Sequence, residues 1–343
     1  MFVITYRKIF FIFSSITIAL SVIFVLVWGL VFGIDFTGGT LIEVSYGGTA
    51  TSQPAATSTA QAGTTISAGT TTASATSVVP DKGAVEARLD TLAIGAYSLR
   101  PSEGNGYILR THDLNQEEEN AVENALSLGG TAPMNVDRVN TVGPVLGEEL
   151  RGKAFFAITV VVLLIIFFIA FAFRHVSKPV SSWKYGTIAI VVLVHDILLP
   201  VGLFAVLGKF FGAEVDGLFV MALLAILGYS VNDTIVVFDR IRENLRHNVE
   251  TNTREEFDIT VGKSLSQTFV RSFNTSLTTG LTLLALFLFG SSSTHYFSLT
   301  LLAGVIAGTY SSIFLAAPLL VWVNNLAPAA QTASGKNKKK KKR

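Results

Sequence analysis

Residues Ala154–Phe173 form the run AFFAITVVVLLIIFFIAFAF, 20 residues without a charge. About 20 apolar residues are enough to carry a helix across the roughly 30 Å hydrocarbon core of a bilayer. Five further segments reach the same length and apolar character: Ile9–Phe32, Gly186–Leu207, Leu218–Phe238, Phe269–Gly290 and Tyr296–Val323. The sequence therefore predicts an α-helical polytopic membrane protein with six transmembrane helices.

Composition supports this class and excludes several others. Half of the 343 residues are hydrophobic and only 15% are charged, too few to cover the surface of a soluble protein. The net charge of +2 gives no basis for nucleic-acid binding, and the absence of cysteine excludes disulfides, thiolate metal sites and cysteine nucleophiles. No nucleophile–base pair, metal-ligand cluster or phosphate loop is visible, so we expect no enzyme activity, no cofactor and no metal.

The basic residues predict the orientation of the chain. Arg7 and Lys8 precede a first apolar run that is too long for a signal peptide, so we interpret it as a retained anchor. If the N-terminus is cytoplasmic, 18 of the 26 Lys and Arg residues fall on the cytoplasmic side. Positive charge accumulates on that side of membrane proteins, so both termini are predicted to be cytoplasmic.

A folded domain is predicted outside the membrane between the first two spans. Alternation in Leu41-Ile42-Glu43-Val44 is typical of a half-buried strand, and Val85, Leu89 and Leu92 have helical spacing. In order, we expect a strand, a helix, two strands, a helix and a strand: Gly38–Tyr46, Asp81–Ile94, Tyr97–Arg100, Tyr107–Arg110, Asn115–Leu128 and Met134–Val142. This βαββαβ order is that of a ferredoxin-like α+β domain, here extracytoplasmic.

Composition also separates two low-complexity segments from the folded parts. Thr49–Val79 draws 25 of its 31 residues from Ala, Thr, Ser and Gly and carries no charge, so we expect a disordered insertion. Lys336–Arg343 is a basic tail that we expect to lie against anionic lipid rather than nucleic acid. The predicted division is 1–32 (cytoplasmic N-terminus and first span), 33–153 (extracytoplasmic domain, insertion at 49–79), 154–323 (five-span bundle) and 324–343 (cytoplasmic tail).

Two glycine patterns predict close backbone packing. Gly33-Ile34-Asp35-Phe36-Thr37-Gly38-Gly39-Thr40 follows the first span, and we interpret it as a structural turn leading into a strand rather than as a ligand loop. Gly304 and Gly308 form a GxxxG pattern in the last span, which is typical of helices in close contact.

Asp233 is the most unusual residue of the fourth span. It lies seven residues before Arg240, which places it roughly 10 Å inside the membrane boundary. An ionised carboxylate at that depth costs at least about 2.5–3.5 kcal/mol, so it needs a partner, a hydrated cavity or a proton. Asp233 with its neighbour Asn232 is therefore either a proton-carrying site or a helix-packing hydrogen bond, and we favour the former because asparagine could pack without that cost.

The fifth span offers a cation. Arg271 lies near the inner boundary, followed by Asn274 and Thr275 within a run of Ser, Thr and Asn that predicts a polar helix face. Arg271 either extends its charge to the interface or lies close enough to Asp233 to favour the ionised carboxylate.

His195 and Asp196 form a second polar pair near the middle of the third span. Adjacent helical side chains point about 100° apart and need not touch. One of them is either hydrogen-bonded inside the bundle or part of a proton path, and the sequence leaves both interpretations open.

Three motifs together resemble the SecF branch of the SecD/SecF family of bacterial protein-export membrane proteins. They are the Gly33–Thr40 turn, Val142-Gly143-Pro144 with Gly147-Glu148-Glu149-Leu150 before the second span, and Gly228–Asn244 in and beyond the fourth. Their order relative to six spans makes the resemblance specific, and it covers nearly the whole chain except Thr49–Val79 and the lysine tail.

The resemblance implies a function and partners. SecF proteins resemble half of a resistance-nodulation-division (RND) superfamily transporter, pair with SecD, associate with the SecYEG channel, and use the proton motive force in late-stage export of unfolded polypeptide. It also implies a place in the bacterial plasma (inner) membrane, YajC as a further candidate partner, and proton-path residues at Asp233 and Arg271. Asn232, His195, Asp196, Asn274 and Thr275 are candidate supporting residues, and SecD is expected to contribute a further carboxylate.

Two other classes stay open, as does the choice between H⁺ and Na⁺ as the coupling ion. An RND-type small-molecule or lipid exporter half is one, although such exporters carry a second large outside domain beyond six spans. A non-transporting scaffold is the other, but it leaves Asp233 and Arg271 without a purpose.

Overall fold

The computed structural model describes residues 2–47, 79–102, 105–172, 181–253 and 255–325. These form two compact units, one of helices from Met1–Gly33 and Gly152–Arg343, the other an α+β domain from Ile34–Arg151. Residues 49–78 of the predicted insertion and the lysine tail lie outside the described residues, whereas Val79 is described.

Six of the described helices are long and apolar enough to cross a membrane, which confirms the predicted fold class. They are α2 (Arg7–Trp28), α6 (Pro144–Ala172), α7 (Ser182–Phe211), α8 (Gly217–Glu250), α9 (Phe257–Phe289) and α10 (Ser292–Ser311). A π turn, η2 (Ser312–Ala316), follows α10 and the sixth span continues to Asn325. The short α1 (Phe2–Thr5) precedes α2.

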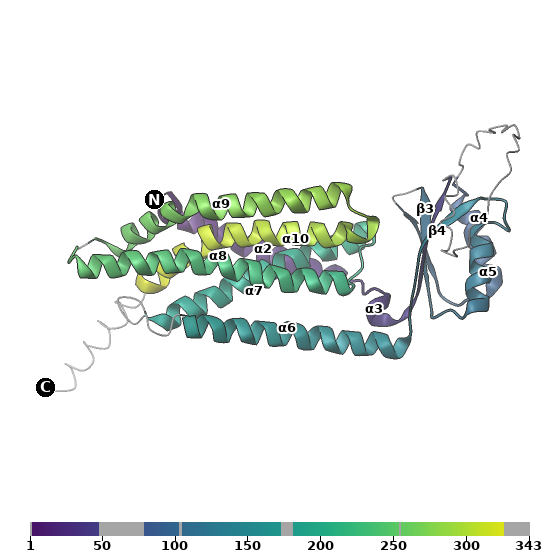
Figure 1. Ribbon diagram of the computed structural model, residues 1–343, viewed down its shortest axis with the longest axis horizontal. Helices are drawn as coiled ribbons and strands as arrows, with labels where there is room; N and C mark the ends of the chain where they lie inside the picture. Colours follow the sequence, from purple (N-terminus) through teal and green to yellow (C-terminus); the bar gives the residue numbers. More distant parts are fainter. Residues whose placement is uncertain (1, 48–78, 103–104, 173–180, 254, 326–343) are drawn as a thin grey trace, which may run out of the picture. The chain divides into compact units, whose positions relative to one another are not determined.

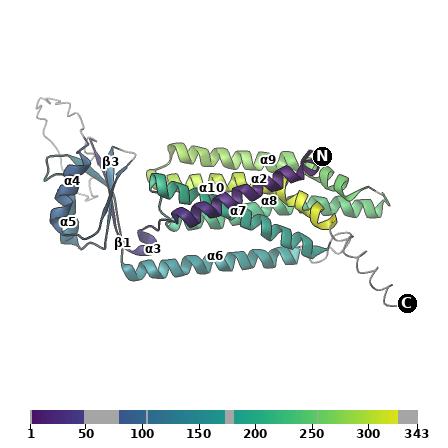
Figure 2. The same ribbon diagram turned by 180° about the vertical axis from the view of Figure 1, so that it is seen from behind.

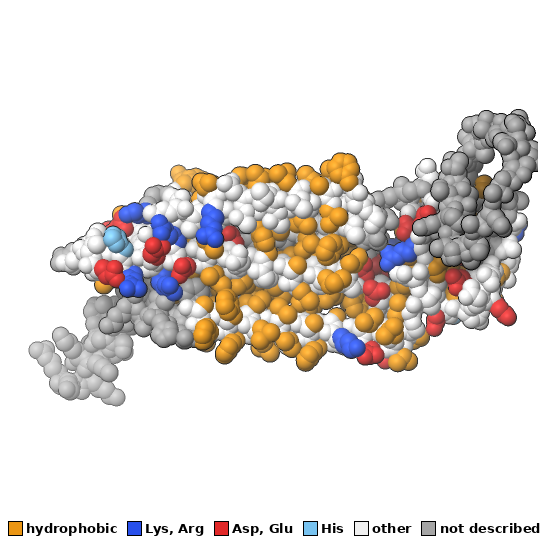
Figure 3. Space-filling view, in the orientation of Figure 1, with side chains coloured by type: hydrophobic (Ala, Val, Ile, Leu, Met, Phe, Trp, Pro, Cys, Tyr) orange, Lys and Arg blue, Asp and Glu red, His pale blue; other side chains and the backbone are white. Residues whose placement is uncertain are grey.

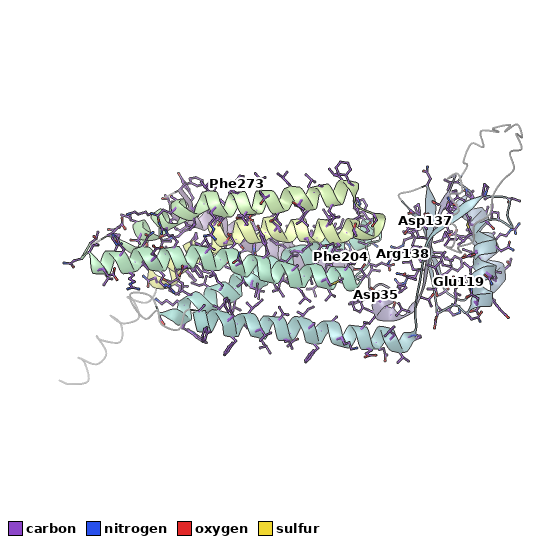
Figure 4. The ribbon with its side chains drawn as sticks, viewed as in Figure 1. Asp35, Glu119, Asp137, Arg138, Phe204 and Phe273 are labelled. Atoms are coloured by element: carbon purple, nitrogen blue, oxygen red, sulfur yellow. The ribbon has the colours of Figure 1, made fainter. Side chains whose placement is uncertain are left out.

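Helices α7, α8 and α10 form the interior of the bundle, with α2 and α9 against them (Figures 1 and 2). Phe204 on α7 illustrates this interior, since it is buried and packs against Phe219 of α8 with ring centroids 4.2 Å apart. Phe273 on α9 instead projects from the outer side of the bundle (Figure 4) and is 48% exposed. Hydrophobic side chains cover the sides of the helices, whereas charged ones gather at the end carrying the α8–α9 connection (Figure 3).

The predicted span ends differ from the helices in three ways. Helix α6 begins at Pro144, ten residues before the predicted start at Ala154. The first span was expected to reach Phe32, but α2 ends at Trp28. There Gly29 takes a φ of 71°, and its N–H donates to the carbonyl of Val25. Residues beyond it are extended, and Phe32 pairs with Val215 as an isolated bridge. Conversely, α8 and α9 extend about a dozen residues past their apolar runs, because polar side chains join them there.

These extensions form a polar hairpin, defined as Arg240–Glu250 of α8 with Phe257–Gln267 of α9. Asn244 donates to Ser264 Oγ at 2.8 Å, and Asn248 donates to Thr260 Oγ1 at 2.9 Å. At its tip, hydrogen bonds from Asn248 and Thr260 lower the pKa of Glu255. The hairpin therefore continues the membrane helices as one joined pair.

The α+β unit has the predicted βαββαβ order. Its elements are β1 (Gly39–Tyr46), α4 (Lys82–Leu89) with a 3₁₀ turn η1 (Asp90–Leu92), β2 (Ser98–Ser102), β3 (Gly106–Thr111), α5 (Gln116–Leu126) and β4 (Met134–Val142). The sheet order is β2-β3-β1-β4 with all neighbours antiparallel, the ferredoxin-like arrangement. Helices α4 and α5 cover one face of the sheet (Figure 1).

The domain core and its local signals agree with the alternation in the sequence. Ile42 and Val44 of β1 are fully buried with Leu126 of α5. Helix α5 begins with a capping box in which Asn115 accepts from the Glu118 N–H at 2.9 Å and Glu118 accepts from the Asn115 N–H at 3.0 Å.

The glycine turn after the first span packs closely against neighbouring backbone, as predicted. A one-turn helix, α3 (Ile34–Thr37), lies within it, and Gly38 and Gly39 follow with φ of 72° and 127°. A Cβ at Gly39 would lie 2.4 Å from Thr111 O. A Cβ at Gly147 would lie 2.8 Å from Gly38 N, so the first two motifs of the family resemblance pack against each other.

The GxxxG prediction is also confirmed. A Cβ at Gly304 would lie 2.3 Å from side-chain atoms of Ile226, and one at Gly308 would lie 3.3 Å from Ser230 Cβ. Glycine at these positions lets α10 approach α8 closely.

Candidate functional site

Two carboxylates lie inside the helical bundle, each about halfway along its helix: Asp196 on α7 and Asp233 on α8. The interior helix α10 contacts both α7 and α8. Each carboxylate binds hydroxyl groups supplied by neighbouring helices.

Asp233 is held by serines from two helices. Ser272 on α9 donates to Oδ1 at 2.6 Å, and Ser312 at the start of η2 donates to Oδ2. Both serines are at most 2% exposed, whereas Asp233 itself is partly buried. Hydroxyl donors stabilise the carboxylate yet still allow it to take up a proton, because they bring no fixed positive charge.

Asp196 is completely buried. Its Oδ2 accepts from Ser311 Oγ at 2.7 Å and from Ser230 Oγ, and its Oδ1 lies 2.9 Å from His195 Nδ1. His195 and Asp196 therefore do contact each other, although adjacent helical side chains need not. The pair is therefore hydrogen-bonded inside the bundle, and a part in a proton path stays a prediction.

Arg271 lies elsewhere than beside Asp233. It is exposed and lines a pocket of about 280 Å³ between α8 and α9, together with Asp239, Arg240 and Glu243. Within the part of the chain that the structure describes, no ion pair joins Arg271 to Asp233. The pocket also includes Val236 and Thr268, one turn along α8 and α9 from the Asp233–Ser272 hydrogen bond.

The remaining predicted residues lie on the exposed surface of the bundle. Asn232 of α8 is exposed, as are Asn274 and Thr275 of α9. On α9, exposed polar residues recur at helical spacing, forming what we call the polar stripe: Arg271, Asn274, Thr275, Thr278 and Thr282. Thr275 and Thr278 donate to their own helix at Arg271 O and Asn274 O, at 2.9 and 3.0 Å.

Sequence reasoning missed the four serines that bind the carboxylates: Ser230, Ser272, Ser311 and Ser312. A serine in an apolar helix usually donates to its own backbone, so its presence alone does not indicate a partner. A signal existed in Ser311-Ser312 followed by Pro318, because proline removes the N–H that would bind the carbonyl of Phe314 and so favours an irregular turn there.

Six apolar spans with hydroxyl-bound carboxylates in their interior define the class, a multi-pass membrane protein. The chain belongs to the SecD/SecF family: residues 123–326 match its description "Protein export membrane protein SecD/SecF, C-terminal", and residues 23–50 match the SecD/SecF GG motif. Within that family it is of the SecF type, a subunit of the protein translocase and not an enzyme, because its named relatives are protein translocase subunits SecF.

Named relatives support this placement. The chain is 39% identical to the protein translocase subunit SecF of Thermobaculum terrenum over 94% of both chains. It is 35% identical to SecF of Pseudomonas aeruginosa, over 90% of this chain and 88% of the relative. These relatives place it among multi-pass proteins of the bacterial plasma membrane.

A solved structure shows the same fold in a longer protein. The crystal structure of SecDF from Thermus thermophilus, described as a translocon-associated membrane protein, matches with a TM-score of 0.70 and 27% identity over 94% of this chain. This chain spans only 38% of SecDF. A second SecDF structure, in a super-membrane-facing form, matches with a TM-score of 0.58 and 26% identity.

Proposed function

We propose that the chain pairs with SecD, works with the SecYEG channel, and couples the flow of protons or another cation to late-stage export of unfolded polypeptide. The observation that carries the ion coupling is Asp233, a carboxylate inside the membrane bundle that binds only hydroxyl donors among the described residues. Such a group can gain and lose its charge at little structural cost, and a charge change inside a bundle favours one helix arrangement over another.

The pocket between α8 and α9 supports a route to this carboxylate. Its polar and charged wall begins one turn from Asp233 and includes Arg271. Water in such a space would connect Asp233 to the end of the bundle where the charged side chains gather, which on the predicted orientation is cytoplasmic (Figure 3). The positive charge of Arg271 then attracts anions and repels cations along this route. Arg271 does not need to bond to Asp233 to have this effect.

The polar stripe on α9 supports the pairing with SecD. Exposed Asn and Arg side chains on a membrane helix are costly against lipid and are expected to face protein or water. Ser272, next to Arg271 of the stripe, donates to Asp233, so a second membrane protein covering the stripe would also approach the Asp233 site. Relatives include fused SecDF, in which a chain of this fold is part of a longer polypeptide.

Cross-linking from the stripe tests the pairing. Because the chain has no cysteine, single cysteines with a photoactivatable maleimide can be placed at Asn274→Cys and, as a matched control about 100° around the helix, at Phe273→Cys. We expect Asn274→Cys to cross-link to SecD in membranes, and Phe273→Cys to react mainly with lipid. Equal cross-linking from both would contradict the stripe as interface, and a cross-link to a second copy would favour the self-associating exporter instead.

Thiol accessibility tests the orientation. An impermeant maleimide should label Glu119→Cys, on the exposed side of α5, in intact spheroplasts, but Val249→Cys in the polar hairpin only after permeabilisation. The expected result follows from the distribution of basic residues. Labelling of both in intact spheroplasts would exclude the proposed sidedness.

A further inference from the structure

Two consecutive serines connect the two carboxylates of the bundle. Ser311 ends α10 and Ser312 begins η2; the first donates to Asp196 of α7 and the second to Asp233 of α8. Because adjacent helical residues point about 100° apart, one turn of α10 can contact both neighbouring helices. A single backbone segment therefore contacts both carboxylates, and a change of charge on either one acts on it.

The backbone at this place is irregular on both sides of the contact. The turn Ser312–Ala316 is π-helical and ends two residues before Pro318, which cannot donate to the carbonyl of Phe314. On α7, Pro200 likewise deprives the carbonyl of Asp196 of its usual helical donor. Helices loosened in this way can change their hydrogen bonding at lower cost than regular ones.

The Asp196 end carries an open hydrogen-bonding position. His195 is fully buried, and its Nε2 has no partner among the described residues, while Nδ1 contacts Asp196. The ring lies against Tyr310 of α10, with centroids 6.2 Å apart. An imidazole that contacts Asp196 through Nδ1 and has no partner at Nε2 has a nitrogen at which a proton can bind, as an ionisable site requires.

We propose that Asp196, with His195, is a second ionisable site of the ion-coupling step, and that Ser311 and Ser312 couple its charge state to that of Asp233. This inference rests on the proposed role of Asp233. The two carboxylates then act as one coupled pair rather than as one site with a structural neighbour.

The serine hydroxyls provide the coupling because each has an alternative acceptor. Ser311 Oγ lies 3.1 Å and Ser312 Oγ 2.8 Å from the carbonyl of Gly308. When a carboxylate binds a proton, its new O–H donates to the serine Oγ, and the serine proton turns to Gly308 O. No other bond changes, so the step balances with one proton taken up.

The shared acceptor sets the sign of the coupling. Gly308 O already accepts the Ser312 N–H, and a carbonyl oxygen has two lone pairs, which leaves room for one hydroxyl. Ser312 has only a longer alternative, Thr309 O at 3.2 Å. Protonation of one carboxylate therefore disfavours protonation of the other.

Other charged groups are few around the pair. Within two helical turns along each contacting helix, the titratable residues besides His195 are Tyr229, Asp239 and Arg240 on α8, Arg271 on α9 and Tyr310 on α10. Helix α2, which packs on α7, carries Arg7 and Lys8 at its first turn. The hydroxyl coupling can thus be separated from direct charge effects by removing the serines alone.

Infrared pH titration of the full-length chain, co-assembled with SecD in lipid, measures both carboxyl groups without requiring export. Bands are assigned with Asp196→Asn and Asp233→Asn. We expect Asp196→Asn to move the Asp233 midpoint to lower pH by about one unit, typical of coupled sites. In a Ser311→Ala/Ser312→Ala background the same substitution should move the midpoint by less than half as much. In a Ser312→Thr background with Ser311 intact, both hydroxyls are kept and the full shift should remain.

Ser298→Ala is the matched control, since Ser298 is equally buried on α10 but donates only to His295 O. It should leave the shift unchanged. A carboxyl band of Asp196 that never titrates, or a shift that survives removal of both serines, overturns the proposal. If those results coincide with loss of gradient-driven export in Asp233→Asn, the role of Asp233 stands and only the coupling fails.

Discussion

Asp233→Asn is expected to abolish the part of export driven by the ion gradient while leaving the protein folded and assembled. Asparagine is nearly isosteric, and its carbonyl can still accept from Ser272, but it cannot release a proton. Its NH₂ can donate to Ser312 Oγ, whose own proton then turns to Gly308 O. The measurement is the rate of late-stage translocation in vesicles, with and without an imposed gradient.

The control exchanges a carboxylate for an amide at the far end of the same helix. Glu250→Gln removes the exposed partner of Arg246 and should leave the gradient-dependent rate unchanged. Arg271→Ala should also lose gradient-driven export, and Arg271→Lys should keep part of it, because the charge in the pocket is retained. An unchanged gradient-dependent rate in Asp233→Asn would remove Asp233 from the mechanism and leave Asp196 as the carboxylate to examine.

Gly202→Ala is expected to give the largest loss of stability from a single methyl group in the bundle. A Cβ at Gly202 of α7 would lie 2.4 Å from Ser21 Cβ and 2.5 Å from Ser21 Cα of α2. These atoms belong to or adjoin the backbone, so α2 and α7 would have to separate. Overpacking of this kind costs about 1–3 kcal/mol, and we expect a clearly lower thermal unfolding midpoint in detergent.

Gly228 of α8 provides the comparison, because a Cβ there would meet no atom within 4 Å. Gly228→Ala should be neutral or stabilising by up to about 1 kcal/mol, as alanine favours helix. Equal unfolding midpoints for the two variants would show that the α2–α7 contact does not limit stability.

The sequence was sufficient for the spans and for the order of the domain elements. Runs such as Ala154–Phe173 have few alternatives to a membrane helix, and the alternation around Ile42 and Val44 predicts a strand with one buried face. It was insufficient for the helix ends. Polar residues such as Asn244 and Asn248 prolong α8 because they donate hydrogen bonds to residues of α9. A local sequence pattern cannot predict such a bond, because its acceptor lies on a different helix.

The site was predictable in part for a similar reason. Asp233 and Asp196 were found because burying a charge in a membrane is costly wherever its partner lies. The partners themselves depend on how α7, α8, α9 and α10 are arranged. Of the two placements left open for Arg271, the one beside Asp233 is not part of this structure. The contact between Asp196 and Ser311 could only be found with the helices in place.

The polar hairpin makes α8 and α9 move as one rigid pair, so a small tilt near Asp233 is amplified at the tip of the hairpin. Hydrogen bonds from Arg240 and Asn244 to Gln267 join the two helices just beyond the membrane part, so they swing together. Glu250 lies 17 residues from Asp233, about 25 Å along the helix axis. A tilt of about 10° pivoting at the depth of Asp233 would therefore carry the tip sideways by about 4 Å. A small rearrangement around one carboxylate would therefore move the tip of the polar hairpin by roughly the spacing between two residues.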